Sequence, residues 1–409
     1  MVGEESVYLK ADICVHDKCC GCAACVSICP KRCLVMQEDE MGEKRPFIDK
    51  NKCIECGLCR KVCQNNQMVD YLKPMSVYAG WRKSAQARVD CSSGGIATAL
   101  SEWFIACGGV VFGATYNRET SVRIVPAETL ETVQSFKGSK YVQAAIDDCY
   151  TALESYLKNG RNVLLFSTPC QIQAVKQYLS VRRVAYTGKL FTVDFLCHGV
   201  VPERYLLDEI STIEENIGCK TDGISFRSNL SELNYNFTLK KADKIVYKEK
   251  AEKQRYFYAF LRSIINRECC NSCKFKCPER VADITLGDFI GLGSKIPFKP
   301  ADGVSNVSLV MVNTDFGVEL LHKIDNEIRV EIRTLKEAVS GGPSLRGGAE
   351  VSRNRKKFRK LYQKYGWDRA IDKATKNAMR LELLYKNSLK NARAIKHCLS
   401  KMWRKNLQR

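Results

Sequence analysis

The chain has 409 residues, a formal net charge of +20 and a hydrophobic content of 45%. This length exceeds that of one ordinary domain and predicts two or three. Because it contains no run of about eighteen apolar residues and no apolar signal-peptide core, we expect neither a membrane-spanning helix nor secretion. The protein should therefore be cytoplasmic, with its 22 cysteines serving as reduced thiols or metal ligands.

Two cysteine motifs with identical spacing begin at Cys19 and Cys53. Each reads C-x2-C-x2-C-x3-C, in which three thiolates bind one 4Fe-4S cluster and the fourth reaches the partner cluster. The first cluster would take Cys19, Cys22, Cys25 and Cys63, and the second Cys53, Cys56, Cys59 and Cys29. Two structural zinc ions are the alternative, although zinc usually takes paired C-x2-C motifs. Cys14, Cys20 and Cys33 fall outside this register and are expected to be packing residues.

The hydrophobic pattern divides the chain into a ferredoxin-like two-cluster α+β module, a mixed α/β body and a basic helical tail. In the module we expect a short strand within 1–14 and a hairpin at 34–37 and 45–49. In the body we expect strands at 77–81, 109–114, 162–166, 190–196, 282–291 and 308–312, and antiparallel strands within 223–249. Helices are expected at 90–107, from 138, at 167–179, 202–213 and 256–267, and from 315. The predicted domains are 1–70, 76–185, 186–348 and 349–409.

Three turns at predicted helix starts offer backbone N–H groups and hydroxyls that suit a phosphate. Their residues are Ser92, Ser93, Gly94, Gly95 and Thr98 in the first, Gly138, Ser139, Lys140, Tyr141 and Gln143 in the second, and Thr168, Pro169 and Gln171 in the third. Serine and glycine also cap helices for purely structural reasons. Three such turns together favour a large dinucleotide-like cofactor, although no G-x-G-x-x-G fingerprint of nicotinamide binding follows a strand.

A third cysteine group combines a C-x2-C pair with two cysteines that follow predicted strands. In a doubly wound sheet such strand ends meet at the carboxyl edge, where sites are assembled. We predict a third 4Fe-4S cluster held by Cys170, Cys197, Cys270 and Cys273, with Cys277 as the rival for one position. The alternative is a zinc site of Cys269, Cys270, Cys273 and Cys277. His198 either relays a proton to a reduced flavin or a substrate, or simply caps its turn.

Six motifs resemble the beta-subunit family of coenzyme F420 hydrogenases and dehydrogenases, and they occur in that family's order. They are SSGG at 92–95, GSKYVQ at 138–143, TPCQ at 168–171, CHG at 197–199, CNSCKF at 270–275 and ADITLGDF at 282–289. The resemblance implies an iron–sulfur flavoprotein oxidoreductase whose mixed α/β body is a flavin-binding body for FAD, with Asp288 among the cofactor-binding residues. Its implied electron partners are a ferredoxin or other redox protein and coenzyme F420 or another small hydride donor or acceptor. A non-catalytic electron-transfer subunit of a larger redox complex is the alternative.

The positive charge is concentrated in residues 351–409, which contain 19 lysines and arginines against three acidic residues. Apolar residues recur there at steps of three and four, at Ile371, Ala374, Ala378, Leu381, Tyr385, Leu389, Ala392, Ile395 and Leu399. This spacing predicts a helix with one apolar stripe. The helix either docks on the body, or contacts an anionic membrane surface or an acidic redox partner. Nucleic acid is not expected, since nothing else resembles a base-reading element.

Overall fold

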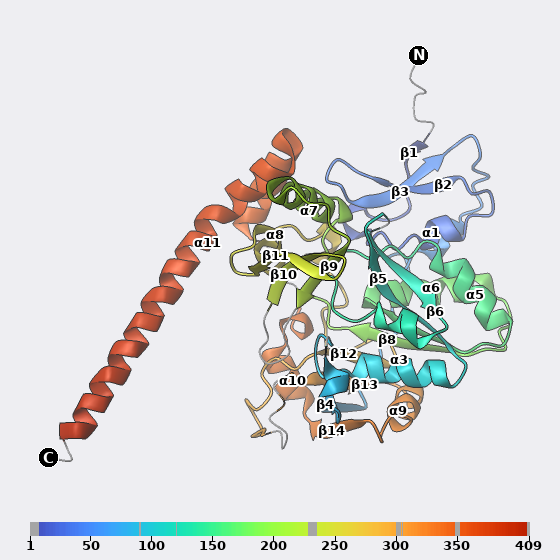
Figure 1. Ribbon diagram of the computed structural model, residues 1–409. Helices are drawn as coiled ribbons and strands as arrows, with labels where there is room; N and C mark the ends of the chain where they lie inside the picture. Colours follow the sequence, from blue (N-terminus) through green and yellow to red (C-terminus); the bar gives the residue numbers. More distant parts are fainter. Residues whose placement is uncertain are drawn as a thin grey trace.

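The computed structural model describes residues 8–89, 91–119, 121–227, 235–299, 304, 306–347 and 352–406. The N-terminal module packs on a larger body, from which one long helix extends (Figure 1). Within the described residues, no helix combines the length and the apolar character needed to cross a bilayer.

The N-terminal module has a three-stranded antiparallel sheet in the order β1-β3-β2, and its strands are β1 (Tyr8–Lys10), β2 (Leu34–Glu38) and β3 (Lys44–Asp49). The expected hairpin is therefore confirmed. Two short helices lie within the first and second cysteine motifs, α1 (Ala24–Ser27) and α2 (Leu58–Val62). Each begins after a residue in the left-handed region, Ala23 at φ 59° and Gly57 at φ 71°, so the chain turns sharply beside the cysteines.

The body is built on one eight-stranded sheet in the order β14-β4-β13-β12-β8-β7-β5-β6. Its strands are β4 (Ser76–Arg82), β5 (Val110–Asn117), β6 (Ser121–Ala127), β7 (Val163–Ser167), β8 (Leu190–Phe195), β12 (Ile284–Asp288), β13 (Ser308–Val312) and β14 (Ile328–Arg333). The central strands β12, β8, β7 and β5 run parallel, and the outer pairs are antiparallel. The two predicted domains 76–185 and 186–348 thus both contribute strands to the same sheet.

Both faces of this sheet are covered, as the alternation of its apolar side chains requires. Val110 and Leu165 face α5 (Cys149–Lys158), α6 (Pro169–Arg182) and the cysteine-bearing segments of the N-terminal module. Val111 and Leu164, one residue along, face α3 (Ile96–Ala106) and α9 (Asp315–His322) instead. The shorter helices are α4 (Leu130–Gln134) and α10 (Leu335–Gly341). The N-terminal module is therefore part of the layer that covers one sheet face.

A second sheet packs with helices around an aromatic core. It contains β9 (Gly223–Arg227), β10 (Tyr235–Lys241) and β11 (Lys244–Lys250), which are antiparallel as expected. The helices are α7 (Glu203–Ile217) and α8 (Arg255–Leu261). The expectation that α8 runs to residue 267 is wrong, because Ser263 takes a left-handed conformation, φ 52°, and the chain turns there.

The helix expected from residue 138 is also a wrong prediction, since the next helix, α5, begins at Cys149. The hydrogen bonds of Lys140 explain why no helix begins at residue 138. Its Nζ donates hydrogen bonds to the carbonyls of Ser135, Phe136 and Lys137 at 2.9–3.1 Å, at the end of α4. Burial lowers the pKa of Lys140 to about 7. The lysine therefore closes the preceding helix instead of opening a new one.

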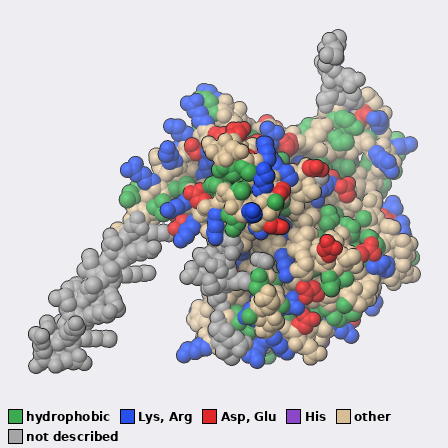
Figure 2. Space-filling view, in the orientation of Figure 1, with side chains coloured by type: hydrophobic (Ala, Val, Ile, Leu, Met, Phe, Trp, Pro, Cys, Tyr) green, Lys and Arg blue, Asp and Glu red, His purple; other side chains and the backbone are tan. Residues whose placement is uncertain are grey.

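The tail forms α11 (Arg353–Asn406), which is interrupted at Gly366 (φ 72°, ψ −167°). Trp367, Ile371 and Ala374 are buried against α7 and α8, and Trp367 Nε1 donates to the Glu209 carboxylate at 2.8 Å. The stripe is therefore docked at its start, whereas Leu381 and Tyr385 further along are 67% and 65% exposed. Beyond it the helix runs away from the body (Figure 1), and lysine and arginine side chains crowd its described surface (Figure 2).

Two truncations should separate the docked part of α11 from the projecting part. A chain ending at residue 385 loses eight lysines and arginines and no acidic residue, and should keep the wild-type thermal midpoint. A chain ending at residue 348 also loses Trp367 and Ile371 from the core, and should be less stable by about 3 kcal/mol or more. Thermal unfolding measures both. Equal midpoints for the two truncated chains would contradict the docking of Trp367.

Candidate redox site

A cavity of about 300 Å³ lies in the N-terminal module. The cysteines that line it are Cys14, Cys19, Cys20, Cys22, Cys25 and Cys63. The four cysteines predicted to hold the first cluster are therefore brought together around one space. Cys14, expected to be a packing residue, also lines this cavity and interacts electrostatically with Cys19 and Cys63. Nothing in the motif spacing indicates this position for Cys14.

The second group of cysteines lies nearer the surface of the module. Cys59 interacts electrostatically with Cys56 and Cys29, and Cys56 is exposed. Cys33 was also expected to be a packing residue. Its Sγ lies 3.3 Å from that of Cys29, and it also interacts with Cys53. Cys29, Cys53, Cys56 and Cys59 are thus neighbours, and this group is the more accessible of the two.

The third group forms where two neighbouring parallel strands end. Cys170 lies in the first turn of α6, just after β7, and Cys197 follows β8. Cys170 interacts electrostatically with Cys197 and Cys273, and the Val200 N–H donates to Cys270 Sγ at 3.5 Å. Cys277 instead donates to the carbonyls of its own loop, Lys274 at 3.5 Å and Glu279 at 3.3 Å. The four predicted ligands of the third cluster, Cys170, Cys197, Cys270 and Cys273, therefore lie at one end of the sheet.

Among the residues that the structure describes, no three histidine, cysteine, aspartate or glutamate side chains converge in the geometry of a single bound ion. In a cubane cluster each thiolate binds a different iron, so the sulfur atoms surround a wider centre. The cavity lined by six cysteines fits this second arrangement.

Polar side chains of the body bind the backbone of the first cysteine motif. The Arg267 guanidinium is fully buried and donates to the carbonyls of Lys44 at 3.0 Å and Cys19 at 3.3 Å. It also donates to Gln143 Oε1 at 2.6 Å, while Gln143 Nε2 donates to the carbonyls of Cys20 and Gly21 at 3.1 Å. The amide of Gln143, predicted to bind a cofactor, is thus occupied in docking the module.

Gly21 is needed at this contact for two reasons. Its φ of +66° disfavours any residue with a Cβ, and a Cβ there would lie 2.7 Å from Gln143 Nε2 and 2.9 Å from the Lys44 carbonyl oxygen. The close approach of the motif to the body therefore depends on glycine.

A polar site joins the first two predicted phosphate turns to Asp288. Asp288 forms an ion pair with Arg227, whose Nη1 also donates to the carbonyl of Ser92. Arg227 Nε donates to Tyr141 Oη at 3.0 Å, and Ser139 Oγ donates to Ser92 Oγ at 2.9 Å. Asp288 ends β12, the parallel neighbour of β8, so this site lies at the same sheet edge as Cys197.

Two residues of the polar site were missed from the sequence. Arg227 and Tyr235 face each other across β9 and β10, and the arginine lies 4.5 Å above the tyrosine ring. Tyr235 Oη donates to Asp288 Oδ2 at 3.1 Å. The only sequence signal for this site was Arg227 itself, an arginine at the end of a mainly apolar strand. Guanidinium, hydroxyl and aromatic groups together suit a ligand that is both anionic and aromatic.

The glycines of the first turn serve the fold. A Cβ on Gly94 would lie 2.2 Å from the Gly80 carbonyl oxygen, and Gly95 has a φ of +87° at the start of α3. Thr98 is buried on α3, with Oγ1 3.5 Å from Cys91 Sγ, and Ser93 is half-buried. Replacing either glycine would therefore disturb packing as well as any ligand.

In the second turn, Gly138 lies in an open turn with a φ of +80°, and Tyr141 stacks on Phe260 with ring centroids 4.9 Å apart. In the third, Pro169 opens α6, and Thr168 Oγ1 donates to Gln171 Oε1 at 3.1 Å. Gln171 Nε2 donates in turn to the Ala144 carbonyl at 2.8 Å. The polar atoms of the third turn are thus mainly paired with one another and with the backbone.

His198 lies next to Cys197 but is bound locally. Its Nε2 lies 3.1 Å from the Phe260 carbonyl oxygen and 3.2 Å from Ser263 Oγ. Burial lowers its pKa, and Lys276 adds to the effect, so the ring is held neutral. This geometry fits the turn-capping interpretation better than proton relay.

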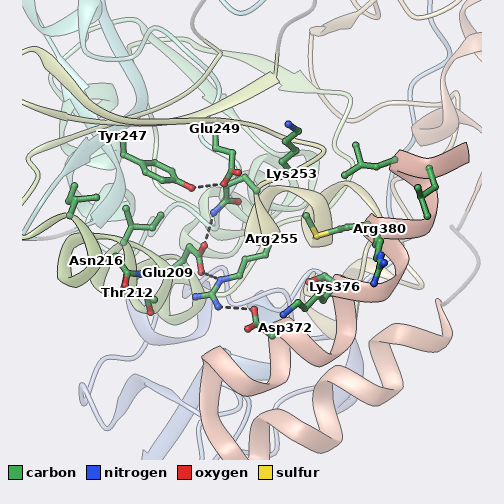
Figure 3. A pocket seen from close by; sticks show the side chains of 17 residues that line it. Glu209, Thr212, Asn216, Tyr247, Glu249, Lys253, Arg255, Asp372, Lys376 and Arg380 are labelled. Atoms are coloured by element: carbon green, nitrogen blue, oxygen red, sulfur yellow. Dashed lines mark hydrogen bonds and ion pairs between the residues drawn. The ribbon is translucent and has the colours of Figure 1, made fainter. Parts of the chain in front are cut away.

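A larger pocket, of about 640 Å³, lies away from these residues, between α7, α8, β11 and α11 (Figure 3). In this pocket Arg255 forms two ion pairs. Its Nε lies 2.8 Å from Glu209 Oε2, and its Nη1 lies 2.9 Å from Asp372 Oδ1. Among the described residues, none of the site residues predicted from the sequence lines this pocket.

Comparison with known proteins gives two family matches and two ferredoxin relatives. Residues 160–338 match the family defined by the C-terminal part of the coenzyme F420 hydrogenase/dehydrogenase beta subunit, and residues 18–66 match the 4Fe-4S dicluster domain. An uncharacterized ferredoxin of Methanocaldococcus jannaschii is 34% identical over 60 residues, which are 14% of this chain and 77% of that protein. A 7Fe ferredoxin of Hydrogenibacillus schlegelii is 37% identical over 56 residues, 14% of this chain and 62% of that protein.

Among solved structures, a chain of the F420-reducing NiFe hydrogenase complex from Methanosarcina barkeri aligns with a TM-score of 0.43 and 18% identity. The alignment covers 76% of this chain and 94% of that chain.

A two-cluster ferredoxin module joined to a mixed α/β body defines an iron–sulfur electron-transfer protein. Residues 160–338 belong to the coenzyme F420 hydrogenase/dehydrogenase beta-subunit family, and a 4Fe-4S dicluster domain precedes them at residues 18–66. The role of the chain is accordingly that of an oxidoreductase component.

Proposed function

We propose that the chain is an FAD- and 4Fe-4S-dependent oxidoreductase that passes electrons between ferredoxin-type clusters and a flavin. The observation that carries this proposal is the spatial arrangement of the three cysteine groups and the polar site around Asp288. Cysteines of the first and third groups pack in the same buried cluster, and the third group shares a sheet edge with Asp288. When bound, FAD would connect single-electron transfer with hydride exchange.

The residues have distinct roles in this proposal. The first group (Cys19, Cys22, Cys25 and Cys63), the second (Cys29, Cys53, Cys56 and Cys59) and the third (Cys170, Cys197, Cys270 and Cys273) each hold one cluster. Ser92 and Ser139 offer hydroxyls to the cofactor's phosphates, and Arg227, oriented by Asp288, supplies positive charge. The exposed Cys56 marks the side on which a ferredoxin or other redox protein exchanges electrons with the second cluster.

Turnover by the isolated protein tests the proposed enzyme activity. Anaerobically purified protein, reduced with dithionite or a reduced ferredoxin, should transfer hydride to coenzyme F420 or to another small acceptor. The acceptor's absorbance change measures the rate. If the flavin is reduced and reoxidised only by a protein partner, and no small molecule is turned over, the chain is an electron-transfer subunit.

Arg227→Met should lower flavin occupancy by about tenfold or more, because it removes charge-assisted hydrogen bonds at the polar site. Arg227→Lys keeps the charge but not the planar fork, and should have an intermediate effect. Flavin content per chain and fluorescence titration with FAD measure the change, and the iron content should stay at the wild-type value. Full flavin occupancy in a folded Arg227→Met variant would remove Arg227 from the proposed site.

A further inference from the structure

The pocket of about 640 Å³ between α7, α8, β11 and α11 takes no part in the proposed redox site (Figure 3). Its acidic side chains are already bound within the protein. Arg255 pairs with two of them, Glu209 and Asp372. The third, Glu249, accepts a hydrogen bond from Tyr247 Oη at 2.6 Å. Each carboxylate that lines the pocket therefore has a protein partner.

Three cationic side chains of the same pocket have no such partner. Lys253 lies two residues before α8, and Lys376 and Arg380 lie four positions apart on α11, so they share one face of that helix. All three are exposed, and in the part of the chain that the structure describes no hydrogen bond or ion pair of their side chains is found. The pocket therefore offers free positive charge, which favours an anionic group as its ligand.

Apolar side chains form the rest of the pocket and continue beyond it. Those that line it are Ile213, Ile217, Met379, Leu383 and Leu384. Leu381 and Tyr385 on α11 and Ile245 on β11 are exposed as well. Apolar side chains that gather beside a polar rim indicate an interaction surface. Because they extend past the pocket on both α11 and β11, this surface suits a protein segment better than a small molecule.

Strand β11 presents an open sheet edge at this pocket. It is the outer strand of its sheet, and no strand among the described residues pairs with its other side. Ala251 N donates to the Tyr235 carbonyl at 2.9 Å, so the alternation of an antiparallel pair directs the N–H groups of Lys250 and Lys248 away from β10. Lysines on such an edge repel a second basic strand. The edge is therefore open to an added strand that carries negative charge.

We propose that this pocket is a docking site for an extended acidic segment of a partner protein, which adds as a strand to β11. The segment would supply backbone hydrogen bonds to β11, carboxylates to Lys253, Lys376 and Arg380, and apolar side chains to the wall around Met379. A second copy of this chain is a poor occupant, because each copy has a net charge of +20 and the same lysine-bearing edge. The inference does not depend on the proposed redox function.

A fluorescent synthetic peptide of alternating glutamate and leucine tests the site in the full-length, cluster-loaded protein. Fluorescence anisotropy should show binding that weakens as salt is added, because the three cations are exposed. The matching peptide of lysine and leucine should not bind. The glutamate–leucine peptide with N-methylated backbone amides should not bind either, since it cannot pair with β11.

The variant Lys376→Glu/Arg380→Glu should weaken binding of the glutamate–leucine peptide by about tenfold or more, because the probe then meets like charges. Lys253→Glu, on the body side of the pocket, should weaken it by about threefold or more. Lys357→Glu/Lys360→Glu is the matched control. It makes the same change of charge on α11 at exposed residues that do not line the pocket, and should stay within about twofold of wild-type binding.

Several results would overturn the proposal. One is the absence of peptide binding at low salt, and another is unchanged binding in a folded Lys376→Glu/Arg380→Glu variant. If that variant does not fold, Lys253→Glu decides in its place, because it leaves α11 intact. Equal weakening by Lys357→Glu/Lys360→Glu would assign binding to the general charge of α11. Equal binding of the N-methylated peptide would reject strand addition, and binding of phosphatidylglycerol vesicles instead of the peptide would make the surface a lipid site.

Discussion

Replacing Arg267 with methionine should lower the free energy of unfolding by about 3–5 kcal/mol, because it removes one partner of a buried polar network. The Arg267 side chain is 0% exposed, and its nearest carboxylate, Glu43, lies 3.7 Å away and is 1% exposed. Methionine fills much of the space but leaves the amide of Gln143 and the carbonyl of Lys44 without their donor. The ferredoxin module should therefore lose its fixed position on the body.

Anaerobic denaturant unfolding, followed by circular dichroism and by cluster absorbance, measures this effect. Arg60→Met is the control, because Arg60 is on the same module but its pair with Asp12 is exposed, 62% and 90% respectively. It should change stability by less than about 1 kcal/mol. Equal stability of the two variants would show that Arg267 does not hold the modules together.

Cys197→Ala should reduce the iron content from about twelve to about eight atoms per chain, because it removes one of four ligands from the proposed third cluster. The two clusters of the ferredoxin module should keep their electron paramagnetic resonance signals. Loss of the third cluster should also prevent reduction of the flavin from the ferredoxin side.

Cys277→Ala decides between the two cysteines that compete for this cluster. The Cys277 thiol is bonded to carbonyls of its own loop, so its removal should leave the iron content unchanged. Loss of iron in Cys277→Ala but not in Cys197→Ala would exchange their roles.

The parts of the molecule predicted from the sequence are those coded by local spacing. The first motif and Cys63 indicated four cysteines around one centre, and the structure gathers them around one cavity. The alternation of strands and helices placed Cys170 and Cys197 at neighbouring strand ends, where the structure has them. Strand β13 and the start of α9 also agree with the expected residues.

The parts that were missed depend on contacts between distant residues. Arg227 and Asp288 are 61 positions apart, and no pattern in either strand indicates that they pair. Gln143 looked like a cofactor ligand, but its partners, Arg267 and the Cys20 carbonyl, lie 124 and 123 positions away. The wrong prediction of a helix from residue 138 has a local cause instead. Lys140 donates hydrogen bonds to carbonyls three to five positions earlier, and these outweigh the glycine and serine signal for a helix start.

Iron, acid-labile sulfide and flavin analysis of anaerobically purified protein, with its ultraviolet–visible spectrum, tests the central claim most directly. Three clusters and one flavin predict about twelve iron atoms and one FAD per chain. About eight irons together with one zinc would remove the third cluster and interrupt the proposed electron path. A full iron content without bound FAD, and without FAD binding on titration, would contradict the assignment of the polar site around Arg227 and Asp288.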